Sequence, residues 1–107
     1  MLNIIIVKGS KYVSLVEFYD HIFGAKTHYS RWVKFYVTEH NTEMPVKGLD
    51  YLDLDELPLD DTVIKKGPYR KDYLISIDFL KQLCFDLKTK RCKDVRAWAN
   101  TIHNKAR

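Results

Sequence analysis

Two short runs of β-branched and aromatic residues, each ending at a serine, constrain the fold most. The first run, Tyr12-Val13, leads into Ser14-Leu15-Val16-Glu17, which has the S-x-x-E pattern of a helix capping box. The second run, Tyr73-Leu74-Ile75, leads into Ser76 and then Asp78, an acid whose charge suits the first turn of a helix. The patterns at Ser14 and Ser76 therefore each predict a strand that is followed directly by a helix with a serine N-cap.

The remaining periodicity predicts the elements around these two junctions. Residues 4–7, before Lys8-Gly9-Ser10, predict the first strand of an N-terminal β-hairpin. Apolar spacing predicts a first helix that ends at Gly24 and a second from about residue 27 or 30 to 39. Residues 49–54 predict a strand that pairs with 73–75. We expect apolar stripes on a third and a fourth helix, namely Leu80, Leu83, Cys84 and Leu87, then Val95, Trp98, Ala99 and Ile102.

This order predicts a small α+β domain: an N-terminal β-hairpin, two helices, a short β-pair and two C-terminal helices. The 107 residues fit one domain, 1–107. Residues 55–71 show no clear period and predict a long loop, a kind of segment that is usually functional or disordered.

The apolar run at 4–7 is too short to span a membrane, and no signal peptide is visible, so we expect a cytoplasmic protein. Cys84 and Cys92 form no disulfide framework.

Charge is distributed unevenly along the chain, whose net charge is +4. Residues 50–61 hold six acids and no base, whereas residues 81–107 hold eight bases and two acids. Such polarity suggests one surface that attracts anions and another that avoids them. Solvated helix faces explain the same pattern equally well.

Catalytic and metal-binding motifs are absent from the sequence. The four histidines show no metal-ligand spacing such as HExxH, and the four glycines are too scattered to form a phosphate-binding loop. We therefore expect no enzyme, no catalytic residue, no cofactor and no metal.

The fourth helix carries the chemistry of a nucleic-acid contact. Lys93, Arg96, Asn100 and Asn104 fall at i, i+3, i+7 and i+11 and share one face. Arginine and lysine hold phosphates or guanine edges, and asparagine pairs with adenine. The sequence therefore predicts a DNA or partner contact on this face. Further candidates flank it or lie on the second helix, namely Lys88, Lys90, Arg91, Arg31 and Lys34.

The stretch "KTHYSRWVKF", residues 26–35, combines bases with regularly spaced aromatics. Tyr29, Trp32 and Tyr36 fall with Val33 on one stripe of the second helix, so we expect them to face inward. The basic side chains of this run are then expected on the exposed face of the helix. The run is thus interpreted as a core-forming helix with a basic rim.

Protein interaction is a third interpretation. The acids of 50–61 are interleaved with leucines at 52, 54, 57 and 59, as in a segment that docks on a basic partner. Self-association through exposed Tyr12, Tyr69 and Phe35 is equally open.

Three stretches also resemble a known family: "VSLVEFYDHIFGAKTHYSRWVKF", "GLDYLDL" and "DYLISIDFLKQLCFDLKTKRCKDVRAWANTI". In order and motif they resemble the AntA/AntB-type phage antirepressor domain, which is related in character to the KilA-N and Bro N-terminal modules. The chain departs from that pattern at Leu80-Lys81, at Ser14-Leu15-Val16 and in its longer loop at 55–71.

The resemblance implies transcription regulation in phage or prophage, inside a bacterial host cell. An antirepressor relieves a repressor by binding the repressor protein, by competing at duplex DNA, or by both, and a homo-oligomer is possible. The resemblance implies core positions at Tyr29, Trp32 and Trp98. It implies exposed basic positions at Lys81, Lys93 and Arg96.

Overall fold

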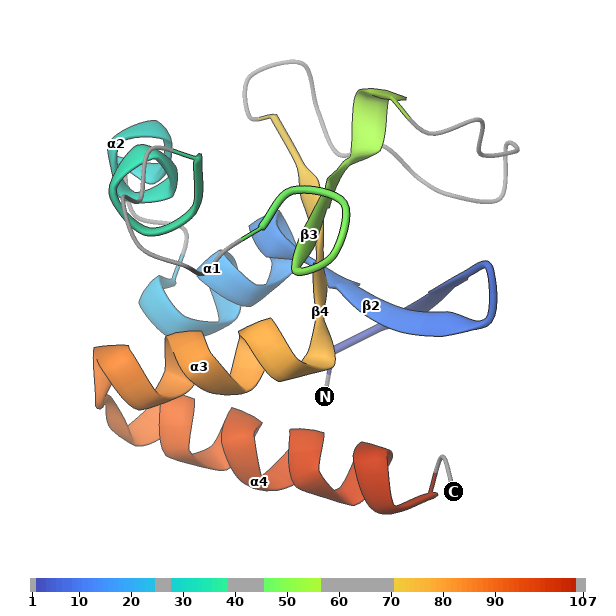
Figure 1. Ribbon diagram of the computed structural model, residues 1–107. Coiled ribbons are helices and arrows are strands. Elements are labelled where there is room, and N and C mark those ends of the chain that lie inside the picture. The colour runs from blue at the N-terminus through green and yellow to red at the C-terminus, as the bar shows by residue number, and fades with distance from the viewer. Residues whose placement is uncertain (1, 25–27, 39–45, 57–70, 106–107) are drawn as a thin grey trace.

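The predicted α+β architecture is confirmed by a computed structural model, which describes residues 2–24, 28–38, 46–56 and 71–105. In this part of the chain a four-stranded antiparallel sheet packs against helices (Figure 1). The elements in chain order are β1 (Ile4–Val7), β2 (Ser10–Ser14), α1 (Leu15–Phe23), α2 (Tyr29–Val33), the π-helix η1 (Lys34–Thr38), β3 (Tyr51–Asp53), the 3₁₀-helix η2 (Leu54–Glu56), β4 (Tyr73–Ser76), α3 (Ile77–Leu87) and α4 (Lys90–Lys105).

The sheet has the strand order β1-β2-β4-β3, so its two central strands, residues 10–14 and 73–76, come from distant parts of the chain. Val13 of β2 pairs with Ile75 of β4, and both side chains are fully buried. The hairpin turn at Lys8 and Gly9 has positive φ at both residues, 50° and 82°, as a two-residue turn with the twist of its strands requires. The predicted hairpin and the predicted β3–β4 pairing are confirmed, and the β2–β4 pairing joins them into one sheet.

Both predicted serine caps are present. The Ser14 hydroxyl accepts a hydrogen bond from the Glu17 N–H at 3.2 Å, and the Ser76 hydroxyl accepts one from the Phe79 N–H at 3.1 Å. Gly24 ends α1 with φ 68°, a conformation that costs glycine nothing. The local signals therefore place the starts of α1 and α3 and the end of α1 correctly.

The second helical segment is irregular but oriented as predicted. Tyr29, Val33 and Val37 are buried, whereas Trp32 and Tyr36 are partly buried against the core. The Trp32 ring centroid lies 5.3 Å from that of Tyr19. The continuation as a π-helix from residue 34 was not predicted.

Some expectations about exposure and extent are wrong. Tyr12 is 9% exposed, because it packs with Leu54 and Leu74, and so it offers no anchor for self-association. Phe35 is indeed exposed, whereas Tyr69 lies outside the described residues, as does most of the predicted loop at 55–71. The predicted strand at 49–54 is shorter and spans Tyr51–Asp53.

Acids at the start of the acidic segment point inward rather than to solvent. Asp50 is 6% exposed and accepts a hydrogen bond from the Val46 N–H at 2.8 Å. Asp53 is equally buried and pairs with the Lys71 ammonium, with 2.7 Å between Oδ2 and Nζ. These two carboxylates hold β3 and its turn in place, so they are not part of a docking surface.

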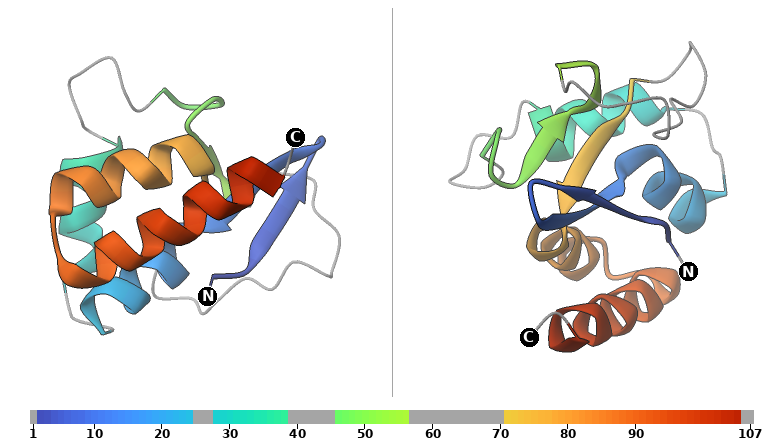
Figure 2. Two further views of the ribbon diagram at one scale, coloured as in Figure 1. Left: turned by 90° about the horizontal axis from the view of Figure 1, so that it is seen from below. Right: turned by 90° about the vertical axis from the view of Figure 1, so that its right-hand side faces the viewer.

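The two C-terminal helices form an antiparallel hairpin and lie side by side (Figure 2). The predicted stripe of α3 is buried at Leu80, Leu83 and Cys84, and that of α4 at Val95 and Ala99. Within the described ranges, no helix is both long enough and apolar enough to cross a membrane.

Candidate nucleic-acid interface

A two-residue turn between α3 and α4 forms a basic hollow on the described surface. Lys88 ends α3 in the left-handed conformation, φ 55°, and its N–H donates to the Cys84 carbonyl at 3.3 Å. Thr89 then caps α4, since its hydroxyl accepts a hydrogen bond from the Cys92 N–H at 3.1 Å. This tight reversal brings the last turn of α3 against the first turns of α4.

The hollow at this turn has a volume of about 460 Å³. Four cationic side chains line it and no carboxylate does; the lining residues are Cys84, Phe85, Lys88, Thr89, Lys90, Lys93 and Arg96. We call this hollow the basic cleft. Because like charges converge on a concave surface, the cleft attracts anions.

An aromatic ring lies among the four cations. Phe85 is 54% exposed, although most large apolar side chains of α3 are buried. The Arg96 guanidinium carbon lies 5.3 Å from the Phe85 ring centroid, within the range of a cation–π contact. The cleft therefore combines cations with an open aromatic surface.

The Cys84 thiol that lines the cleft is held in its neutral form. Burial, together with the neighbouring Cys92 thiol, raises the pKa of Cys84 to about 12, and the Arg96 charge only partly offsets this. Both cysteines are buried and unpaired. The Cys84 thiol stays protonated at neutral pH, so it presents an uncharged, weakly polar surface to the cleft.

Four of the predicted site residues line the cleft together, namely Lys88, Lys90, Lys93 and Arg96. Asn100 is exposed one turn beyond Arg96 on α4 and continues the predicted face outside the cleft. Lys81 is partly buried on α3 and is not a lining residue. The side chain of Asn104 lies outside the described residues.

Three other predicted residues have different surroundings. The Arg91 guanidinium donates to the His21 carbonyl at 3.0 Å, so it fastens α4 to α1. Arg31 on α2 and Lys34 at the start of η1 are exposed, but they do not line the cleft. In Figure 1, α2 and α4 lie at opposite ends of the molecule. The structure therefore separates the bases of the second helix from those of the fourth.

Sequence reasoning missed Phe85 and the lining role of Thr89. The sequence pattern could have predicted the exposure of Phe85. This residue follows Cys84 directly and falls outside the apolar stripe of α3, so helical spacing places its ring away from the core. Thr89 also caps α4 through its hydroxyl, a role that threonine favours directly before a helix.

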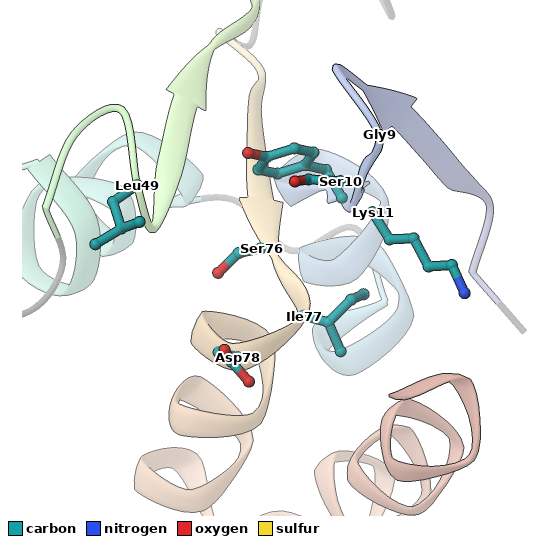
Figure 3. Close-up of a pocket in the computed structure, with 8 residues that line it drawn as sticks. Gly9, Ser10, Lys11, Leu49, Ser76, Ile77 and Asp78 are labelled. Atoms are coloured by element: carbon teal, nitrogen blue, oxygen red, sulfur yellow. The ribbon is translucent and has the colours of Figure 1, made fainter. Parts of the chain in front are cut away.

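A second hollow, of about 330 Å³, lies between the β1–β2 turn and the start of α3 (Figure 3). Its charged lining residues are Lys11 and Asp78, of opposite sign, and the Lys11 side chain extends away from Asp78. The Ser76 hydroxyl there is already used as a helix cap. This hollow has no net preference for anions, so the basic cleft is the better candidate.

Within the described ranges, no group of three or more histidine, cysteine or acidic side chains could hold a metal ion. Comparison with known proteins gives no relative either: no family model, no curated protein and no solved structure matches the chain significantly. The geometry of the cleft and the motifs of the sequence are therefore the basis for a functional proposal.

Proposed function

We propose that this chain is a transcription-regulatory domain of the phage antirepressor type that works by binding, and that it contacts nucleic acid through the basic cleft. The observation that carries the proposal is the convergence of Lys88, Lys90, Lys93 and Arg96 on one hollow without an acid among the lining residues. Lysine and arginine neutralise backbone phosphates, and their clustering gives most of the affinity for nucleic acid.

The antirepressor role itself rests on the resemblance of the three sequence stretches. Its mechanism is a coupling of binding equilibria and needs no bond chemistry. A domain that occupies DNA, or that captures a repressor, lowers the fraction of operators that the repressor fills. The setting would be the cytoplasm of a bacterial host.

The proposal is tested by fluorescence anisotropy of labelled DNA, duplex and single-stranded, titrated with the protein from low to high salt. Four phosphate contacts predict a slope of roughly −3 to −4 for log K against log salt. Lys93→Glu with Arg96→Glu should weaken binding strongly and make the slope shallower by about two.

Arg31→Glu with Lys34→Glu is the matched control. It replaces one lysine and one arginine, both exposed on a helical segment, and changes the net charge equally. We expect it to weaken binding only slightly. If the wild-type protein binds no DNA at low salt, or if both pairs of substitutions act equally, the cleft is not the nucleic-acid site.

Capture of a repressor protein is the second candidate function. The observation that favours it is edge strand β1, on which Ile4 is 39% and Ile6 is 57% exposed. Exposed apolar edge strands pair with strands of other proteins. Ile6→Lys should abolish capture and leave DNA binding intact, whereas the cleft variant should do the opposite.

A further inference from the structure

The exposed aromatic of the cleft is not explained by binding to duplex phosphates. The bases of a duplex are stacked on one another, so a duplex that lies on the four cations offers ionic contacts but no base face to Phe85. An exposed phenylalanine beside cations is instead typical of proteins that bind unpaired strands, where bases stack on aromatic side chains and cations follow the backbone.

The exposed part of the Phe85 ring is large enough to contact a second aromatic group. Arg96 already lies at 5.3 Å from the ring centroid, and Phe85 is still 54% exposed with that contact in place. A flat aromatic group that packs on the open part of the ring would bury apolar surface. The contact also holds Arg96 beside the ring, where its charge can reach a phosphate on the same group.

The size and polarity of the cleft fit one nucleotide. Its volume of about 460 Å³ lies in the range of sites that enclose small ligands. Phe85 and the protonated Cys84 thiol form an uncharged part, and Lys88, Lys90 and Lys93 form a cationic part. A small inorganic anion would use the cations alone. A group with one apolar face and one anionic end uses both parts.

We propose that the basic cleft binds an unpaired nucleotide, with its base stacked on Phe85 and its phosphate held by Lys88, Lys90 and Lys93. This inference rests on the proposed nucleic-acid binding and narrows it to strands with unstacked bases. The same chemistry is offered by a free nucleotide and by a nucleotide within a single strand, and the test distinguishes these two sources.

The test compares Phe85→Leu with the wild-type chain. Leucine keeps the apolar bulk but removes the π face. Anisotropy is measured with a labelled oligothymidine strand and with a duplex of equal length. We expect Phe85→Leu to weaken single-strand binding roughly 5- to 150-fold and to change duplex binding less than about twofold. Phe85→Trp should retain single-strand affinity, because it keeps a stacking surface.

Phe35→Leu is the matched control, since Phe35 is 67% exposed on η1 and does not line the cleft. It should leave both affinities unchanged. Competition with free thymidine triphosphate identifies the source. Displacement of the strand, lost in Phe85→Leu, supports the proposal with free nucleotides as ligands. Phe85-dependent strand binding that resists the triphosphate supports it with a single strand as the ligand.

Two failures are distinguishable. If Phe85→Leu binds single strands as tightly as the wild-type chain, the stacking inference is overturned, whereas a duplex affinity that still depends on Lys93 and Arg96 leaves the proposed function standing. If neither form of DNA binds, the proposed function fails, and the stacking inference fails with it.

Discussion

The Ser14 hydroxyl donates a hydrogen bond of 2.6 Å to the carboxylate of Asp72, although 58 residues separate them. The other carboxylate oxygen of Asp72 accepts from the Val16 N–H at 3.1 Å and from the Tyr73 N–H at 2.8 Å. Asp72 is only 8% exposed. One buried side chain thus ties the start of β4 to the first turn of α1.

Asp72 makes stability depend on pH in an unusual direction. Burial raises its pKa above the ordinary value of 3.8, and the hydrogen bonds from Ser14 and Val16 only partly oppose this. The folded state therefore binds a proton more readily than the unfolded state. The contribution of Asp72 to stability falls as pH rises from about 3.8 through the raised pKa. Asp72→Asn should remove this decrease, as thermal unfolding at a series of weakly acidic pH values would show.

Asp72→Ala tests the hydrogen bonds rather than the charge. It leaves the Ser14 hydroxyl and the Val16 N–H without their acceptor in a buried place, so we expect a loss of about 1–3 kcal/mol in the free energy of unfolding. Urea unfolding at neutral pH measures it. If the urea midpoint of Asp72→Ala equals that of the wild-type chain within error, water accepts the hydrogen bonds of Ser14 and Val16 in place of the carboxylate.

Asp53 should show the opposite pH dependence. Burial alone would raise its pKa, but the hydrogen bonds from Lys71 and from the Asp55 N–H, together with the Lys71 charge, hold the pKa below 3.8. Its stabilisation is therefore complete above pH 3.8 and is lost as pH falls through the lowered pKa. Asp53→Asn should lower the melting temperature at neutral pH. The difference should shrink in high salt, because the Lys71 side chain is 50% exposed.

The two cysteines should resist alkylation in the folded protein. The pKa of about 12 keeps Cys84 protonated, and Cys92 is fully buried. Iodoacetamide at neutral pH should label neither thiol in native protein and both in denaturant, as mass spectrometry would show. Rapid labelling of native protein would contradict the described packing of α3 on α4.

Lys88 allows stability and binding to be separated. A side chain at φ 55° is strained, and glycine is not, so Lys88→Gly should raise the free energy of unfolding by about 0.5–1 kcal/mol. The same change removes one cation from the basic cleft, so DNA binding should weaken and its salt slope should become shallower by about one. Thermal unfolding and anisotropy on one preparation measure both. A variant that is less stable would show that the Lys88 side chain has a structural contact of its own.

Local chemistry explains which parts of the fold could be predicted. The caps at Ser14, Ser76 and Thr89 and the end of α1 at Gly24 depend on residues within one turn, so the sequence reveals them. The β2–β4 pairing and the role of Asp72 depend on residues far apart in the chain, and no local pattern signals either. The inward turn of Asp53 also depends on a distant partner, Lys71.

The candidate site shows the same division. Helical spacing grouped Lys93 and Arg96 correctly, because both belong to one helix. The hydrogen bond from the Arg91 guanidinium to the His21 carbonyl, which keeps Arg91 out of the cleft, could not be predicted. It depends on where α1 lies against α4. The position of the Phe85 ring beside Arg96 could not be predicted either, because it is set by the packing of α3 on α4.

The central position of β4 has a consequence for how the protein is made. β2 finds its second neighbour only when residues 74–76 are available, so a ribosome must synthesise about 70% of the chain before the sheet can close. Until then the hairpin leaves β2 with an open edge. Any truncation that removes β4 leaves two incomplete halves, with β1–β2 on one side and β3 on the other, and neither has a sheet to fold onto.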